Sequence, residues 1–526
     1  MRYLLWLAYL VFAWRRLSTY LHIFQQEEYQ PVRFVRWLFR TRSLDIRVSI
    51  VILVAGALEF AIRLAPDIGA LFVIAALLGI AIYEKKLRAS TKKRLVMTAR
   101  ARRIYSVAFF CLALIGLLYA FTGLPLLAWL IPVHVVPFAL PLATLLLSPQ
   151  EKSVQKKFWN EAHAKLKALS PTVIGITGSY GKTSTKHLLG HILELQAPTL
   201  ITPGSVNTPM GVSRVIREQL GAHHRFFVCE MGAYGPGSIA RLCRLAPPDV
   251  AVITAIGMAH YERFKTLDTV AAAKFELPAA AAERNGDIIL SDSVLKFQIA
   301  RDFRAQHAAN TVAVGFDSQS EFRIVNAAQT ADGIMAQVMW NDQLYTLRAP
   351  IFGEHHIGNM ALAFATACRA GIAPEDAILA LNSAPQISHR LEVKEGPAGS
   401  RLIDDAYNSN PVGFASALNL LNALRTDGGR RILVTPGMVE LGTAHDEQHR
   451  EVGVLARSTV DVLLPVLPER IPSFIAAYQM NNPTGTVIPC ADFAAAQIWM
   501  NQNAKPNDVV LLENDLPDLY EKKLSL

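Results

Sequence analysis

The chain has 526 residues, enough for about three domains. Its mean hydropathy of +0.26 is unusually high for a soluble enzyme. The five cysteines show no Cys-x-x-Cys spacing and so indicate neither a disulfide framework nor a zinc site, which suits a reducing cytosol. The net charge of +9 belongs largely to two basic segments near the N-terminus, so it indicates contact with anionic membrane lipids and no binding of nucleic acid.

Most of the apolar excess lies before residue 150. Four nearly uncharged runs of roughly 17–24 residues are each long enough to cross a bilayer. These runs are Val48–Leu64, Ile68–Tyr83, Ile104–Phe121 and Leu124–Leu147. A shorter run, Tyr3–Trp14, either crosses as a fifth helix or lies at the interface, and its basic pair follows the apolar run, which disfavours a cleaved signal peptide. The sequence therefore predicts a membrane region over residues 1–150 with four to five transmembrane helices.

Basic residues between these runs predict their orientation. Residues 15–47 and 84–103 are rich in arginine and lysine, whereas the short connections near Pro66 and Thr122 are almost uncharged. By the positive-inside rule these basic segments, taken to be loops, are cytoplasmic, and two helical hairpins then place everything after residue 150 on the same side. We therefore expect a multi-pass protein of the cell membrane whose catalytic domains are cytoplasmic.

The rest of the chain has the pattern of an α/β protein. Residues 151–170 are charged and helix-prone, and are predicted to form a linker helix. From Pro171 onward strand-like runs alternate with helical stretches, as in parallel sheets. The predicted strands are Phe226–Cys229, Val250–Ile253, Leu402–Ile403, Ile432–Val434, Val460–Leu464 and Val509–Leu512. A more β-like section over 311–350 and a helical region over 359–381 precede a predicted boundary that separates a domain at 171–384 from one at 385–526.

The segment Gly175-Ile-Thr-Gly-Ser-Tyr-Gly-Lys-Thr-Ser-Thr185 carries the strongest chemical signal. It follows an apolar strand-like pair and leads into a helical pattern, so its backbone N–H groups and the helix dipole are placed to bind phosphate. A chance surface turn is the alternative, which the flanking elements disfavour. We expect Lys182 to supply a mobile positive charge and Thr183 to hold Mg²⁺. The predicted phosphate-binding residues are Gly178, Gly181, Lys182, Thr183 and Ser184.

Further segments fit the same nucleotide-dependent site. Glu230 ends an apolar strand, where a phosphate-loop fold needs an acid for Mg²⁺, although an exposed terminal Glu is the simpler alternative. His260 follows a second predicted strand, and Lys274 lies on a small, apolar helix face, where a lone lysine would ordinarily be taken to snorkel to solvent. A turn at 353–359 enters a helix, and the strand at 402–403 ends in carboxylates and a polar turn.

These segments together resemble the Mur ligase family, the ATP-dependent amide ligases of peptidoglycan assembly. The likeness runs from about Val173 to the C-terminus, and the family loop Gly-x-x-Gly-x-x-Gly-Lys-Thr/Ser-Thr/Ser explains why the first glycine stands at position 175. Other segments that match in order are Asn207–Gly211, Glu230–Gly232, Thr254–His260, Ala273–Leu277, His355–Asn359 and His389-Arg390. The chain most resembles the D-alanyl-D-alanine-adding type, through Asp404–Pro411, Gly437–Gly442 and His449. The resemblance implies a phosphate-loop central ATPase domain followed by a Rossmann-like C-terminal domain.

The resemblance also implies a mechanism. ATP would phosphorylate the carboxylate of a muramoyl peptide, and D-alanyl-D-alanine or a related amine would attack the acyl phosphate, with release of ADP and phosphate. The catalytic residues would be Lys182, Lys274 and His260: Lys182 on the β- and γ-phosphates, and His260 with a carbamylated Lys274 on a second Mg²⁺. Thr183 and Glu230 would hold the first Mg²⁺. Asn359 and His355 would lie near adenine, and Arg390 and Asp405 would reach the nucleotide when the two domains close.

Two departures from the family concern the substrate. Membrane helices replace the N-terminal domain that binds the uridine diphosphate sugar, so we expect the muramoyl-peptide acceptor to be lipid-linked or presented by another protein. Near the C-terminus, Glu513-Asn514-Asp515-Leu516 stands where the family places Lys-Gly-Ser, which changes recognition of the amine or acceptor. Two alternatives remain open: a membrane-bound poly-amino-acid synthetase of the capsule type, and a membrane transporter or sensor with a non-ligase ATPase domain.

Overall fold

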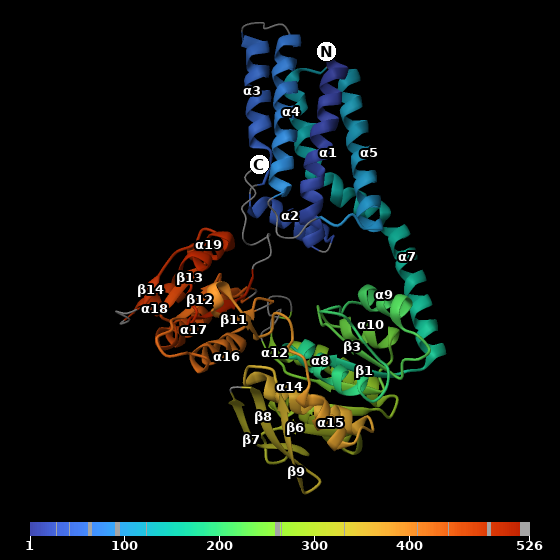
Figure 1. Ribbon diagram of the computed structural model, residues 1–526. Helices are drawn as coiled ribbons and strands as arrows, with labels where there is room; N and C mark the ends of the chain where they lie inside the picture. The colour runs from blue at the N-terminus through green and yellow to red at the C-terminus, as the bar shows by residue number, and fades with distance from the viewer. Residues whose placement is uncertain are drawn as a thin grey trace. The chain divides into compact units, whose positions relative to one another are not determined.

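The computed structural model describes the chain apart from residues 28, 42, 62–65, 90–94, 123, 258–263, 265, 331, 408, 440, 481–484 and 516–526. The described residues form two compact units, Met1–Gln155 and Lys156–Asp515 (Figure 1). The first unit is entirely helical, and the second contains two β-sheets with helices packed on them. This confirms the α/β class that the sequence predicts for the second unit, whereas the predicted domain limits stay predictions.

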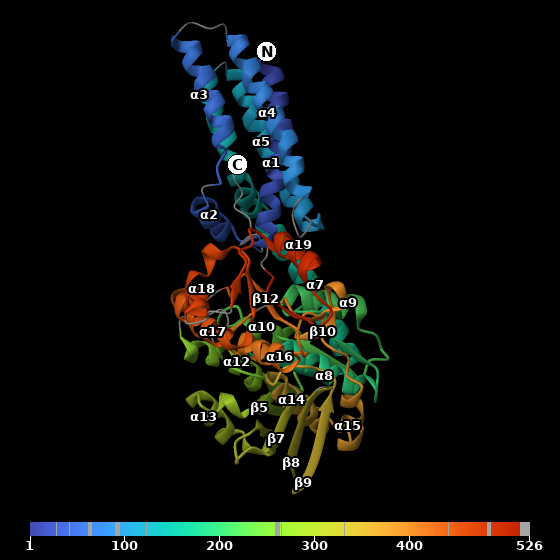
Figure 2. The ribbon, with the colours of Figure 1, turned by 60° about the vertical axis from the view of Figure 1, so that its left-hand side comes forward.

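The first unit is a bundle of apolar helices. Its main elements are α1 (Arg2–Gln26), α2 (Pro31–Arg40), α3 (Ile46–Ala61), α4 (Pro66–Ala89), α5 (Ala99–Thr122), α6 (Leu130–Val135) and the first part of α7 (Ala139–Leu169). Figures 1 and 2 show α1, α3, α4 and α5 running side by side. Large apolar side chains such as Phe60, Phe72 and Phe110 are exposed on the outside of the bundle. By length and composition, two helical stretches in the described part are able to cross a membrane, Ala99–Thr122 and Leu126–Leu169.

One sequence-based expectation about this unit is wrong in detail. Helix α1 continues through Arg15 and Arg16 to Gln26, so this basic pair does not lie in a loop. Arg16 is buried and pairs with Asp45 at 2.6 Å, and each side chain is only 3% exposed. A buried guanidinium is tolerated because the carboxylate neutralises it. Residues 151–169 are helical as predicted, and they form the last part of α7, which runs from Ala139 to Leu169 with Pro149 inside it.

The first sheet of the second unit has nine strands in the order β2-β3-β1-β4-β5-β6-β7-β8-β9. The strands are β1 (Thr172–Thr177), β2 (Thr199–Ile201), β3 (Phe226–Glu230), β4 (Val250–Ile253), β5 (Asp287–Ser291), β6 (Thr311–Gly315), β7 (Phe322–Thr330), β8 (Gly333–Trp340) and β9 (Gln343–Ala349). All neighbours are parallel up to β7, and β7, β8 and β9 pair antiparallel, which confirms the more β-like section predicted over 311–350.

Helices cover both faces of this sheet because its central strands are apolar on both sides. On β1, Ile174 and Ile176 belong to the core beneath α8 (Lys182–Glu194), α14 (His355–Arg369) and α15 (Pro374–Asn382). Val173 belongs to the opposite core, which contains residues of α9 (Pro209–Gln219), α10 (Ser238–Leu245), α12 (Leu267–Ala282) and α13 (Gln298–Gln306). Because β3, β1 and β4 are parallel neighbours, their carboxyl ends lie together at one edge of the sheet. This is the edge at which parallel α/β sheets bind ligands.

The second sheet has six strands in the order β10-β11-β15-β12-β13-β14. The strands are β10 (Glu392–Glu395), β11 (Arg401–Asp405), β12 (Arg431–Thr435), β13 (Val462–Pro465), β14 (Thr486–Val487) and β15 (Val509–Glu513), and only β10 is antiparallel to its neighbour. The core on one face contains residues of α16 (Pro411–Ala423), α17 (His445–Thr459) and α18 (Pro472–Gln479), and the core on the other face contains residues of α19 (Phe493–Asn503). The predicted strands at 402–403, 432–434 and 509–512 are confirmed.

Candidate nucleotide site

The Gly-rich loop connects β1 to α8 as predicted. Gly181 precedes the helix with a φ of +82°, and a Cβ there would clash with the side-chain oxygen of Asn359. A Cβ on Gly178 would likewise clash with the hydroxyl of Thr254. Glycine is thus required at both positions, because the loop packs tightly against its neighbours while its first helical N–H groups stay available for an anion.

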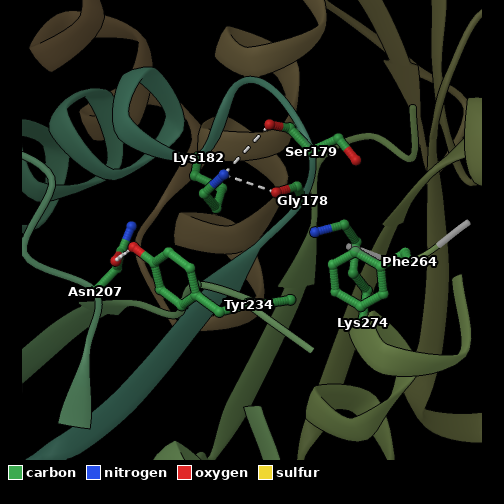
Figure 3. Close-up of a pocket in the computed structure, with 9 residues that line it drawn as sticks. Gly178, Ser179, Lys182, Asn207, Tyr234, Phe264 and Lys274 are labelled. Atoms are coloured by element: carbon green, nitrogen blue, oxygen red, sulfur yellow. Dashed lines mark hydrogen bonds between the residues drawn. The ribbon is translucent and has the colours of Figure 1, made fainter. Parts of the chain in front are cut away.

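Lys182 lies over this loop. Its ammonium group donates to the carbonyl oxygens of Gly178 at 2.7 Å and Ser179 at 3.4 Å (Figure 3). Burial lowers the pKa of Lys182, and the negative charge of Glu230 opposes that shift. The loop carbonyls therefore hold the cation beside the predicted phosphate cradle.

Glu230 stands at the end of β3, directly beside β1 in the sheet. Its Oε2 accepts from Thr183 Oγ1 at 3.0 Å and from Lys186 Nζ at 3.2 Å, and its Oε1 accepts from Asn207 Nδ2 at 3.1 Å. Burial alone would raise the pKa of Glu230, but Lys182, Lys186 and the hydrogen bonds outweigh it and hold that pKa below its ordinary value. The predicted alternative of an exposed Glu is wrong, since the residue is 1% exposed.

A pocket opens beside Lys182, and Lys274 of α12 reaches into it. Figure 3 shows the amino group of Lys274 pointing toward Gly178, with the rings of Tyr234 and Phe264 around the same space. Lys274 is 4% exposed, so the predicted alternative of a snorkelling lysine is wrong. Burial and the nearby Lys182 lower the pKa of Lys274 well below its ordinary value. Burial therefore disfavours the charged ammonium form.

His355 and Asn359 lie one turn apart at the start of α14, below the loop. Asn359 Oδ1 accepts from Thr185 Oγ1 at 3.3 Å, so this side chain supports the phosphate loop from beneath. His355 shares a hydrogen bond of 2.9 Å with Ser416 Oγ, which lies on α16 over the second sheet. Burial lowers the pKa of His355 to about 4, so the ring is neutral. Proximity of these two residues to adenine stays a prediction.

The turn before β10 presents Arg390. Its guanidinium lies 4.4 Å from the centre of the Tyr407 ring, and its charge contributes to the lowered pKa of Lys182. His389 and Leu391 on either side have φ values of +59° and +48°. A side chain rarely adopts this conformation unless its surroundings hold it there.

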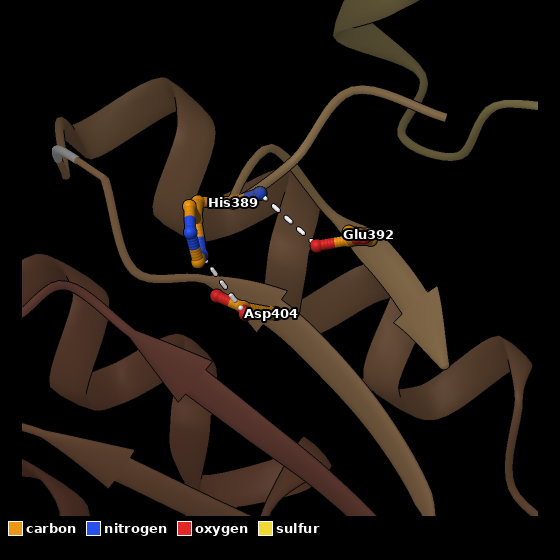
Figure 4. Close-up of side chains that lie close together, drawn as sticks. All are labelled: His389, Glu392 and Asp404. Carbon is orange, nitrogen blue, oxygen red and sulfur yellow. Dashed lines mark hydrogen bonds and ion pairs between the residues drawn. The ribbon is translucent and has the colours of Figure 1, made fainter. Parts of the chain in front are cut away.

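An ion-pair cluster holds this turn. The ligand atoms of His389, Glu392 and Asp404 all lie within 4.8 Å of one another. His389 Nδ1 bonds to Asp404 Oδ2 at 3.0 Å, and the backbone N–H of His389 donates to Glu392 Oε2 at 3.2 Å (Figure 4). Lys394 Nζ donates to the same Asp404 oxygen at 2.6 Å. Because Lys394 already pairs with both carboxylates, the cluster is a structural network that fixes the backbone around Arg390.

Asp405 adjoins the same turn but is buried. Its Oδ1 accepts from the backbone N–H of Leu391 at 3.3 Å, and its register partner on β15 is Glu513. Burial raises the pKa of Asp405 to about 6, against the charge of Arg390. The structure thus brings Arg390 and Asp405 to one turn, while a contact of Asp405 with nucleotide stays a prediction. His260, the remaining predicted site residue, lies outside the described residues.

The sequence predicted no role for three residues of this site, although Asn207 lies in one of the segments that resemble the family. Lys186 pairs with Glu230, Tyr234 donates its hydroxyl hydrogen to Asn207 Oδ1 at 2.8 Å, and Asn207 in turn holds Glu230. A signal for Lys186 was present, since it follows Lys182 by one helical turn and must share its face of α8. The loop, the buried carboxylate and the two buried lysines define an α/β enzyme that binds a nucleoside triphosphate.

Comparison with known proteins identifies the family. The Mur ligase middle domain matches residues 176–367, and the glutamate ligase domain of Mur ligases matches residues 389–513. The UDP-N-acetylmuramoyl-tripeptide--D-alanyl-D-alanine ligase of Bacillus subtilis is 31% identical over 374 residues, which cover 69% of this chain and 79% of that protein. The relative of the same name from Mycobacterium tuberculosis is 31% identical and covers 66% of this chain and 71% of its own length.

Solved structures agree with this assignment. The MurF ligase from Thermotoga maritima in complex with ADP aligns with a TM-score of 0.57 at 26% identity, over 70% of this chain and 82% of that chain. MurF from Acinetobacter baumannii has a TM-score of 0.59 at 24% identity, over 70% of this chain and 78% of that one, a likeness of fold. The chain belongs to the Mur ligase family. It is therefore an ATP-dependent ligase, which disfavours a transporter or sensor.

Proposed function

We propose that this enzyme joins D-alanyl-D-alanine, or a closely related amine, to the carboxylate of a muramoyl tripeptide in peptidoglycan precursor synthesis. The observation that carries the proposal is the convergence of Lys182, Lys274 and Glu230 at the carboxyl ends of β1 and β3, in a chain similar to ligases named for this reaction. The capsule-type synthetase is not favoured, because the relatives that match most of the chain are named for a single addition.

The reaction proceeds in two steps, phosphoryl transfer and then attack by the amine. An oxygen of the acceptor carboxylate attacks the γ-phosphorus of ATP, and ADP leaves from that phosphorus to give an acyl phosphate. The amine nitrogen then attacks the acyl carbon, phosphate leaves, and the nitrogen loses a proton. Lys182 and the loop N–H groups neutralise the negative charge of the transferring phosphoryl group, which is the main contribution a protein makes to such a transfer.

The oxygen atoms at the end of β3 suit Mg²⁺. Glu230 and the Thr183 hydroxyl are hard ligands of the kind that this ion prefers, and they lie 3.0 Å apart. When bound there, Mg²⁺ supplies positive charge to the phosphate oxygens. His260 and Lys274 are the residues we assign to a second ion.

Lys274 fits the carbamylated form proposed for it. Among the described residues no carboxylate pairs with its amino group, and burial together with Lys182 favours the neutral amine. A neutral amine is the form that attacks carbon dioxide, with loss of one proton, to give a carbamate. The carbamate oxygens would then balance the positive charge of Lys182 and supply an oxygen ligand for a metal ion.

Arg390 is assigned to the nucleotide phosphates, and the second sheet to a Rossmann-like domain that moves with it. The described geometry supports this assignment because Arg390 acts electrostatically on Lys182, and because His355 below the loop bonds to Ser416 on α16. Asp405 holds the turn beside Arg390 through the Leu391 N–H, and its contact with nucleotide remains part of the proposal.

We further propose that the first unit is a multi-pass membrane domain, that the ligase domains are cytoplasmic, and that the acceptor is lipid-linked. Exposed Phe60, Phe72 and Phe110 on the helical bundle support a lipid environment. The test offers the purified full-length enzyme equal amounts of UDP-linked and lipid-linked muramoyl tripeptide with ATP and D-alanyl-D-alanine, and follows both products by mass spectrometry. Faster conversion of the lipid-linked acceptor is expected. Equal or faster conversion of the UDP-linked acceptor rejects the lipid-linked assignment, and absence of both products rejects the ligase proposal.

A further inference from the structure

Lys186 is a fully buried cation at the nucleotide site to which no role has yet been given. It follows Lys182 by one turn of α8, and its side chain is 0% exposed. Its ammonium group donates to Glu230 Oε2 at 3.2 Å and to the carbonyl oxygen of Gly204. The charge is thus fixed between the end of β3 and the loop after β2, whereas Lys182 is held by the phosphate loop itself.

The Glu230 carboxylate has donors on both oxygens. Asn207 donates to Oε1, and Thr183 and Lys186 both donate to Oε2. A metal ion that binds Glu230 together with Thr183 must break the hydrogen bond from the Thr183 hydroxyl to Oε2. It must then share that oxygen with the ammonium group of Lys186. Two cations on one buried carboxylate oxygen repel each other strongly, because little solvent is present to screen them.

Bound nucleotide changes this balance. Its phosphates bring several negative charges to the loop, and these offset both Lys182 and Lys186. We propose that Lys186 makes divalent-metal binding at Glu230 conditional on bound nucleotide, so that the metal enters with the triphosphate. This inference rests on the assignment of Glu230 and Thr183 as metal ligands in the proposed function. Lys186 acts through Glu230 and is therefore a positioning residue, which holds the carboxylate in place and blocks the metal until phosphates arrive.

The test measures metal binding directly, without turnover. Mn²⁺ is titrated into the full-length protein in detergent, with and without ADP, and free Mn²⁺ is followed by electron paramagnetic resonance. Lys186→Met removes the charge and keeps the chain length. Lys186→Gln is the second variant, since its amide still donates to Glu230 if the methionine variant does not fold. Glu230→Gln shows which part of the binding belongs to this site, and melting curves confirm that each variant is folded.

The expected result is that wild type binds Mn²⁺ at the Glu230-dependent site only in the presence of ADP. Both Lys186 variants bind it without ADP at least about tenfold more tightly than wild type, and this binding disappears when Glu230→Gln is added. The inference is overturned if the Lys186 variants still need ADP, if wild type binds equally well without it, or if wild type binds no Mn²⁺ at Glu230 even with ADP. Binding of ADP in metal-free buffer judges the nucleotide site separately, so failure of the two proposals is distinguishable.

Discussion

Replacement of Glu513 by glutamine should stabilise the second sheet increasingly as pH rises. Glu513 is fully buried at the end of β15 beside Asp405, and Ser409 Oγ donates to its Oε1 at 2.5 Å. Its Oε2 has no donor among the described residues. A proton on that oxygen, shared with Asp405, satisfies both carboxyl groups. Burial and the negative charge of Asp405 accordingly raise the pKa of Glu513 well above its ordinary value.

The sign and size of the effect follow from proton linkage. Native Glu513 keeps its proton at pH values where the unfolded side chain, with a pKa of 4.5, has lost it. The native state therefore binds more protons, and its stability falls with rising pH by about 1.4 kcal/mol per unit above the unfolded pKa. Glutamine never ionises, and its amide can donate to Asp405 while its Oε1 accepts from Ser409. The variant should match wild type near pH 5 and become more stable than wild type as pH rises, by up to about 1.4 kcal/mol per pH unit for as long as native Glu513 keeps its proton.

Hydrogen exchange measured by mass spectrometry gives the local opening free energy of peptides from β11 and β15 in the full-length protein. Measurements at pH 5, 6, 7 and 8 give the slope of the difference between Glu513→Gln and wild type. Glu395→Gln, an exposed substitution on β10, is the matched control and should show no such slope. A difference that does not change with pH, or a variant that loses stability at pH 8, refutes a protonated native Glu513.

Three further results are expected. Gly181→Ala should weaken ADP binding, measured by isothermal titration calorimetry, by at least about tenfold. Alanine in this left-handed backbone conformation costs about 1–2 kcal/mol, and its Cβ would also clash with Asn359. The control Gly428→Ala has a similar φ of +75° and no neighbour within 4 Å, so it should bind ADP normally. Carbon-13-labelled bicarbonate should give a carbamate signal in the nuclear magnetic resonance spectrum of wild type that is absent in Lys274→Ala, and its presence in both would contradict the carbamylation of Lys274. Asp404→Asn weakens the network around Arg390 and should lower the rate of phosphate release by about tenfold. A melting curve should show that the variant is still folded. An unchanged rate would rule out a role for that network in catalysis.

The sequence predicts well those features that are set by neighbouring residues. Strand β4 covers the predicted Val250–Ile253, and the phosphate loop lies between a strand and a helix as its glycines indicate. These features depend on local apolar patterns and on backbone conformations that only glycine adopts readily. The carboxylate at Glu230 was predicted for the same reason, because strand ends are readable in a sequence.

Contacts between distant segments were not predictable. Helix α1 continues through Arg16 because Asp45, far along the chain, neutralises the charge. Asp405 was assigned to nucleotide from the resemblance to the family, and its pairing with Glu513 follows from the register of β11 and β15. Pairing of this kind depends on tertiary packing, which a single sequence does not reveal.

Phosphate release from ATP tests the central proposal most directly. The full-length enzyme in detergent is given ATP with muramoyl tripeptide, with D-alanyl-D-alanine, with both or with neither, and Lys182→Ala is assayed in parallel. The account predicts rapid release only when both substrates are present. It also predicts a loss of at least about a hundredfold in Lys182→Ala, which lacks the cation beside the phosphate loop. Release that is independent of the two substrates, or that survives in Lys182→Ala, would contradict an ATP-dependent ligase acting at this site.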